Sequence, residues 1–220
     1  IRHNPEVIRQ VNQFFNEPHK DNGVAFAVDV QRIGAAFAPD KNTIYFPTDP
    51  SYLTYDTLVH ELGHALGKRQ PLSPNNYPTP DEYAKAVSIG EAEAILNEYR
   101  IFKMDMQNPD IINAKEAFRD SLPLFEHLDQ QLLKGRDIEQ LPPSEQESVY
   151  HYIAAENAKM VPSSFGGYKN SLTYHEKSIV THFMYDGQWS SYVNMMGKPT
   201  HQDLESLVQD EQIFRDTKTM

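Results

Sequence analysis

The chain has 220 residues, a formal net charge of −11, a pI near 5.2 and no cysteine. This length is enough for one large domain with a sizeable core, and the lack of cysteine excludes disulfides and thiolate metal sites. The acidic balance argues against nucleic acid and anionic membranes as partners, and no apolar run reaches the ~18 residues that a membrane-spanning helix needs.

The N-terminal part is predicted to contain one helix followed by a small sheet. Asn4-Pro5 is typical of a helix cap with proline in the first turn, and apolar residues at helical spacing follow it. Apolar, β-branched runs over residues 24–30, 33–37 and 43–46 predict short strands. Because turn-forming residues separate the last two runs, we expect a hairpin or two adjacent strands there.

The most informative segment is the run His60-Glu61-Leu62-Gly63-His64, which matches the H-E-x-x-H pattern. On a helix, residues four apart project from one face about 5–6 Å from each other, so His60 and His64 can bind one metal ion. Glu61 projects to one side of the line that joins the two histidines, where a carboxylate can accept a proton from a metal-activated water. The run therefore predicts two ligands and a base.

The motif helix is predicted to be amphipathic and largely buried. Its apolar stripe is formed by Leu58, Leu62, Ala65 and Leu66. Histidines on a buried helix need polar partners, and Zn²⁺ bound by histidine and carboxylate would supply one. Gly67 stands where a C-terminal glycine would end the helix.

After a Pro- and Asn-rich loop, the chain is predicted to be almost wholly helical. Thr79-Pro80 opens a long helix that runs past Arg100. Residues 111–133 are helical with an interruption at Pro123, and a capping box at Ser144 opens a helix that ends before Pro162. A glycine-containing loop and a final helix are predicted at residues 163–170 and 200–214.

Strands first and helices after indicate an α+β fold. We expect a single domain over residues 1–220, with a small mixed sheet and the motif helix in about 1–70. The mostly helical part is expected in about 79–220.

The identity of the third zinc ligand is open from the residues alone. The longer pattern H-E-x-x-H-x-x-G-x-x-H places a histidine where this chain has Gln70, whose amide is a poor zinc ligand. The next predicted helix offers Glu91, Glu93 and Glu98. Glu91 is preferred because a stripe of small residues on that helix would allow close approach to the motif helix: Ala86, Gly90 and Ala94. Glu98 is also placed to orient a ligand histidine from behind.

This arrangement resembles the gluzincin branch of the zincin metallopeptidases, whose third ligand is a glutamate on the helix after the motif helix. Glu91-x-x-Ala94 is similar to the pattern around that ligand in aminopeptidase-like members. The resemblance covers about residues 33–100. It implies a zincin-like fold packed on the motif helix, zinc ligands His60, His64 and Glu91, and Glu61 as the catalytic base.

One departure from the family concerns the position four residues after the ligand. Members similar to thermolysin carry an aspartate there, and this chain has Ile95. If Glu93 were the ligand, Asn97 would stand at that offset. Glu93 therefore remains an alternative to Glu91.

The resemblance implies a zinc-dependent metallopeptidase that hydrolyses peptide or amide bonds, with Glu61 assisting the attacking water. The strand before the motif helix is expected to pair with an extended substrate, with residues 34–37 and 43–46 as candidates. An oxyanion donor is also required. Candidates lie in or after the glycine-containing loop: Tyr168, Tyr174, His175, His182 and Tyr185.

A cysteine-free zincin with a helical second half also resembles the effector or toxin metallopeptidase domains that bacteria deliver through secretion systems. That resemblance implies a protein that is secreted or delivered by a bacterial secretion system. The sequence shows no signal peptide, and without such delivery we expect a cytoplasmic protein. The resemblance also implies a protein or peptide substrate, peptidoglycan peptides included, and an immunity or inhibitor protein as partner. The alternative is a non-catalytic sensor or partner-binding module with structural zinc, which would have no use for Glu61.

Overall fold

The computed structural model describes residues 4–16, 23–27, 35–38, 41–48, 54–69, 80–108 and 113–160. The expected oxyanion donors, the helix over residues 200–214 and Gln70 lie outside these ranges. The chain divides into two compact units, one made of Ile1–Gln70 with Gly90–Ile153 and the other of Pro71–Ile89 with Ala154–Met220. The motif, the sheet and all contacts discussed below belong to the first unit.

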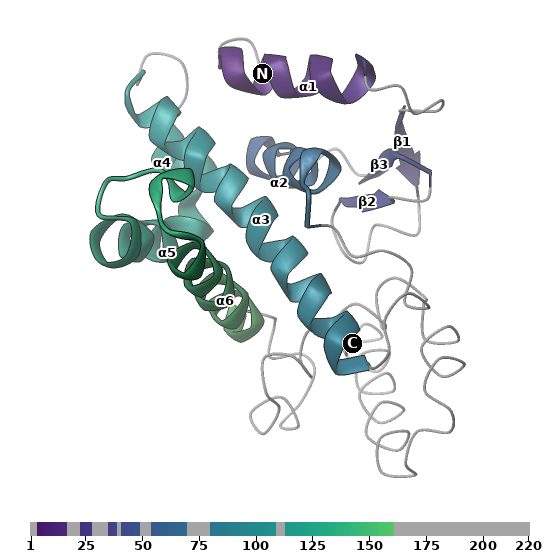
Figure 1. Ribbon diagram of the computed structural model, residues 1–220. Coiled ribbons are helices and arrows are strands. Elements are labelled where there is room, and N and C mark those ends of the chain that lie inside the picture. The colour runs from purple at the N-terminus through teal and green to yellow at the C-terminus, as the bar shows by residue number, and fades with distance from the viewer. Residues whose placement is uncertain are drawn as a thin grey trace, which may run out of the picture. The chain divides into compact units, whose positions relative to one another are not determined.

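The described residues form a mixed α+β structure that is mostly helical, as expected (Figure 1). The α-helices are α1 Pro5–Asn16, α2 Tyr55–Leu66, α3 Pro80–Met106, α4 Ala114–Ala117, α5 Leu122–His127 and α6 Pro143–Met160. Short helical turns are the 3₁₀ segments η4 Arg119–Ser121 and η6 Ile138–Gln140 and the π-helical segment η5 Leu128–Leu133. No described helix is both long enough and apolar enough to cross a bilayer.

The sheet is small and mixed, as the strand pattern predicts. Its strands are β1 Gly23–Ala27, β2 Ala36–Ala38 and β3 Thr43–Pro47, in the order β1-β3-β2. β3 runs parallel to β1 and antiparallel to β2. Because β3 has a neighbour on both sides, its backbone groups are already paired, and the expectation that residues 43–46 pair with a substrate is wrong.

Helix α1 begins where the cap pattern predicts. The Asn4 side-chain oxygen accepts hydrogen bonds from the backbone N–H groups of Glu6, at 2.8 Å, and Val7, at 3.3 Å. The buried residues of α1 are Val7, Gln10 and Phe14, spaced three and four apart. This face packs on α2.

Helix α2 is buried on a different stripe from the expected one. Its fully buried apolar residues are Val59 and Leu62, whereas Leu58 and Ala65 are half-buried. The stripe shifts because α2 contacts both α1 and β2, so more than one side is covered. Helix α2 ends at Leu66 as expected, but Gly67 has extended backbone angles, φ −68° and ψ 152°, instead of the left-handed conformation of a glycine cap.

The close approach predicted from the small-residue stripe is observed at Ala94 of α3. A Cβ atom added to Gly63 of α2 would lie 2.7 Å from the Ala94 Cα atom. Gly90, one turn earlier on α3, is buried as well. The absence of a side chain at Gly63 therefore brings the backbones of α2 and α3 together.

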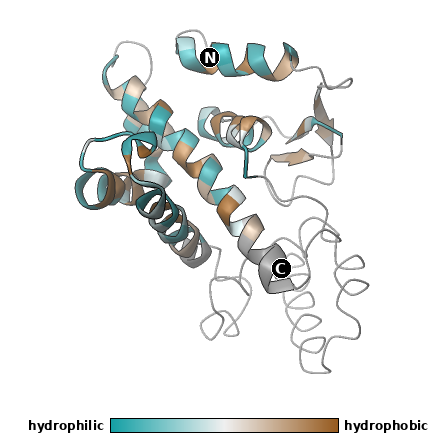
Figure 2. Cartoon of the chain, in the orientation of Figure 1, coloured by the Kyte–Doolittle hydropathy of each residue, from teal (hydrophilic) through white to brown (hydrophobic). Residues whose placement is uncertain are grey.

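The second half of the first unit forms the other part of the core. Its helices carry hydrophobic residues among hydrophilic ones (Figure 2). The long helix α3 begins at Pro80 as predicted, and the predicted break in residues 111–133 falls before Pro123, which occupies the first turn of α5. Helix α6 begins at Pro143, so Ser144 lies within its first turn and is not its cap, contrary to expectation. The largest fully buried side chains here are Phe118, Phe125, Leu96, Ile101, Leu128 and Leu133.

Candidate metal centre

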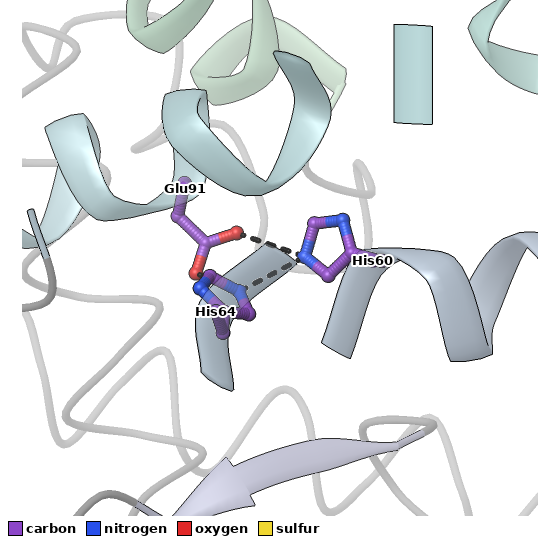
Figure 3. A group of neighbouring side chains, drawn as sticks. All are labelled: His60, His64 and Glu91. Atoms are coloured by element: carbon purple, nitrogen blue, oxygen red, sulfur yellow. Dashed lines mark hydrogen bonds and ion pairs between the residues drawn. The ribbon is translucent and has the colours of Figure 1, made fainter. Parts of the chain in front are cut away.

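The two motif histidines of α2 and Glu91 of α3 point toward one another (Figure 3). The Nε2 atoms of His60 and His64 lie 3.0 Å apart. The Glu91 carboxylate lies 3.5 Å from Nε2 of His60 and 3.4 Å from Nε2 of His64. Of the described residues, these three form the one group whose ligand atoms converge closely enough to hold a metal ion.

The separations suit tetrahedral zinc. Zinc–nitrogen and zinc–oxygen bonds of about 2.0–2.1 Å place neighbouring ligand atoms about 3.3–3.4 Å apart in a tetrahedron. The two histidine nitrogens lie 3.0 Å apart, and the two oxygens of Glu91 lie 3.5 Å from His60 and 3.4 Å from His64 respectively, so either oxygen would need only a small shift to reach that spacing. Two imidazole nitrogens and one carboxylate are also a ligand set that catalytic zinc sites use.

Glu91 and Glu98 lie at opposite nitrogens of the His60 ring. The Nδ1 atom of His60 is 2.5 Å from Oε1 of Glu98, whereas Glu91 lies on the Nε2 side. Ser121 donates a hydrogen bond of 3.3 Å to the other Glu98 oxygen. Glu98 therefore lies behind the His60 ring and outside the group formed by His60, His64 and Glu91.

Glu93, the other alternative, is engaged at the end of α2. Its Oε2 atom accepts a hydrogen bond of 2.7 Å from the backbone N–H of Arg69. A Cβ atom at Gly67 would lie 2.4 Å from this same oxygen, which explains why a glycine suits the position. Glu93 thus supports the exit of the motif helix, and Glu91 is the glutamate that faces the two histidines.

Glu61 is buried beside this group. It is 5 % exposed, and its Oε2 atom has no hydrogen-bond partner among the described residues. The backbone N–H of Phe37, on β2, donates to the carboxylate. Burial raises the pKa of Glu61, while the neighbouring histidines and the Phe37 hydrogen bond act in the opposite direction.

The electrostatics of His60 reflect its two carboxylate neighbours. Burial disfavours the charged ring, but the hydrogen bonds and negative charges of Glu91 and Glu98 outweigh it. The pKa of His60 is therefore raised well above its usual range. A divalent cation on the Nε2 side of the ring would also offset the negative charge of Glu91.

A buried amide pair, which the sequence interpretation did not identify, connects three helices around the site. Asn97 of α3 donates to the backbone carbonyl of Val59, one residue before the motif, at 2.8 Å. Asn97 and Gln10 of α1 also exchange hydrogen bonds of 2.7 and 3.1 Å. Amide residues at helical spacing carry no sequence signal for such a pair, because it depends on which helices meet. The hydrogen bond from Ser121 to Glu98 likewise has no local sequence signal.

Comparison with known proteins identifies no relative of this chain. No protein-family model matches the chain, and no curated protein or solved structure matches it.

Proposed function

We propose that the protein is a zinc-dependent metallopeptidase of the zincin type. His60, His64 and Glu91 would hold the ion, and Glu61 would act as the general base. Bound at such a site, zinc supplies a Lewis acid that brings the pKa of water to about 7 and polarises the scissile carbonyl.

The observation that carries the proposal is the state of Glu61. Burying a carboxylate oxygen without a hydrogen-bond partner costs folding free energy. Here the oxygen belongs to Glu61, which lies in sequence between the two histidines that converge on Glu91. A structural zinc site needs no such carboxylate. An enzyme site needs it to accept and return a proton.

The reaction assigned to Glu61 is amide hydrolysis. Glu61 accepts a proton from the attacking water while a C–O bond forms at the substrate carbonyl carbon. It then delivers this proton to the amine nitrogen as the C–N bond breaks. The hydrogen bond from Phe37 and the packing of α2 hold the carboxylate in place during both transfers.

A gluzincin-like arrangement is supported by the position of each part. The helix after the motif helix carries Glu91, and β2 contacts α2. Among the described strands, β2 is paired only with β3 and lies at an edge of the sheet. It therefore remains the candidate for pairing with an extended peptide, which favours a protein or peptide substrate.

The test combines zinc content with hydrolysis in one set of variants. Glu61→Gln is expected to bind zinc as the wild type does and to hydrolyse a mixture of unstructured peptides about 10²–10⁴-fold more slowly, the usual contribution of a general base. Glu91→Ala should lose zinc, and the matched variant Glu93→Gln should keep it. Full hydrolysis by Glu61→Gln would exclude this mechanism, and zinc binding without hydrolysis in the wild type would favour the non-catalytic alternative.

A further inference from the structure

We propose that Glu98 is a positioning residue for His60 and that Ser121 holds Glu98 in this role. The inference rests on the proposed zinc site and specifies how the chain orients its first histidine ligand. It assigns a function to a buried carboxylate that the hydrolytic step does not use.

Glu98 is buried with both oxygens engaged. It is 5 % exposed, with Oε1 at the His60 ring and Oε2 accepting from Ser121. Among the described residues, the His60 ring is its one ion-pair partner. Since a buried carboxylate is retained only where its partners compensate for lost hydration, the contact to His60 is the main reason for its presence here.

The contact determines which nitrogen of His60 faces the site. A carboxylate only accepts hydrogen bonds, so the Nδ1 atom beside Glu98 must carry a proton. In the neutral ring, this leaves the Nε2 lone pair free of hydrogen, directed at His64 and Glu91. Glu98 thereby selects the tautomer and the ring orientation that metal binding needs.

One face of α3 supplies both the third ligand and the support. Glu91 and Glu98 are seven positions apart, two turns on the same face, and they lie on the two sides of the His60 ring. Ile95, between them, is buried and apolar, so it cannot make this contact. Ser121 adds a restraint from η4, a segment outside both helices.

The experiment measures zinc affinity by competition with a chelator of known affinity. Glu98→Ala is expected to weaken zinc binding by about 10–100-fold, the effect usual for the outer partner of a ligand histidine. Glu98→Gln keeps an acceptor for Nδ1 but loses the charge, so its affinity should fall between those of Glu98→Ala and the wild type. The visible absorption bands of the Co²⁺-loaded protein should change in the same order, because they report ligand geometry at the metal.

The Ser121 contact is tested in two backgrounds. Ser121→Ala should weaken zinc binding less than tenfold in the wild type and have no further effect in Glu98→Ala. Glu93→Gln, which alters a carboxylate of α3 that contacts Arg69 instead, is the matched control and should stay within about twofold of the wild type.

Each outcome distinguishes this inference from the proposed function. Wild-type zinc affinity in Glu98→Ala, or an equal loss from Ser121→Ala in both backgrounds, would overturn the positioning role while leaving the enzyme proposal intact. Zinc binding that depends on Glu98 in a protein without hydrolytic activity would support the positioning role and overturn the enzyme proposal. A wild type that binds no zinc would overturn both.

Discussion

Gly63 determines how closely the motif helix approaches the helix that carries Glu91. A Cβ atom there would lie 2.7 Å from the Ala94 Cα atom and 3.0 Å from Asn97 Cβ. The first of these atoms belongs to the backbone of α3, which cannot move aside as a flexible side-chain end would. An added methyl group must therefore separate the two helices.

We predict that Gly63→Ala lowers the free energy of unfolding by about 1–3 kcal/mol, the usual cost of overpacking a tight contact. It should also weaken zinc binding, because Glu91 would move away from the histidines. Urea unfolding and zinc titration measure the two effects, with Thr57→Ala on the same helix as control. In a helix without this contact, the same change would stabilise by up to about 1 kcal/mol, so a rise in stability would contradict the packing described.

The individual site residues were predictable to different degrees. His60, Glu61 and His64 follow from the sequence because their geometry requires only one helix turn. Glu91 was preferred on the basis of a small-residue stripe, and the structure places it at the histidines. The spacing of Glu98 predicts a place behind one of the histidines, and the structure puts it at His60. The contacts of Glu93 with Arg69 and of Glu98 with Ser121 have no local sequence pattern.

At the scale of the elements, α1 is tied to the site by polar as well as apolar contacts. Gln10 and Asn97 pair side chain to side chain, and Asn97 also holds the Val59 carbonyl of α2. Both side chains are buried, at 6 % and 8 % exposure. Removal of either leaves the other with unpaired amide groups away from water.

We predict that Gln10→Ala and Asn97→Ala each lower the free energy of unfolding by about 1–3 kcal/mol, because each strands a buried partner. The double variant should lose less than the sum of the two, with a coupling of about 0.5–3 kcal/mol. Chemical denaturation of the four proteins measures this cycle, and Gln13→Ala, on the exposed face of α1, is the control. Additive losses would mean that the two amides do not interact.

The boundaries of elements were predicted where a strong local signal is present. Asn4-Pro5 and Pro80 mark helix starts correctly, since a cap and a proline act within one turn. Ser144 was misassigned because Pro143 begins α6 and places the serine inside the helix. The antiparallel pairing of β2 with β3 confirms the predicted hairpin. The parallel pairing of β1 with β3 was not predictable, because β2 lies between these two strands in the sequence.

At the scale of the whole molecule, the proposed zinc site would link metal binding to folding. A ligand that binds only the folded chain stabilises it by about 2.7 kcal/mol at a concentration one hundred times its dissociation constant. A bound cation would also reduce the electrostatic self-repulsion of the folded chain, which has a net charge of −11. Zinc should therefore raise the midpoint of thermal unfolding and a chelator should reverse this rise.

The linkage is specific to the proposed ligands. His64→Ala and Glu91→Ala should show little or no zinc-dependent shift in scanning calorimetry, whereas Glu93→Gln should show the wild-type shift. An equal shift in His64→Ala would indicate that zinc binds elsewhere on the chain.

The sequence by itself determined the α+β character, the helix that carries His60 and His64, and three glutamates as candidates for the third ligand. These depend on periodicity and on spacing within single elements, which the chain encodes locally. Only the tertiary structure decided among those glutamates. The contact of Gly63 with Ala94 sets how α3 lies on α2, and this places Glu91 at Nε2 of His60, Glu98 at Nδ1 and Glu93 at the end of the motif helix. A helix pattern specifies which residues share a face, but packing between distant segments specifies what that face meets.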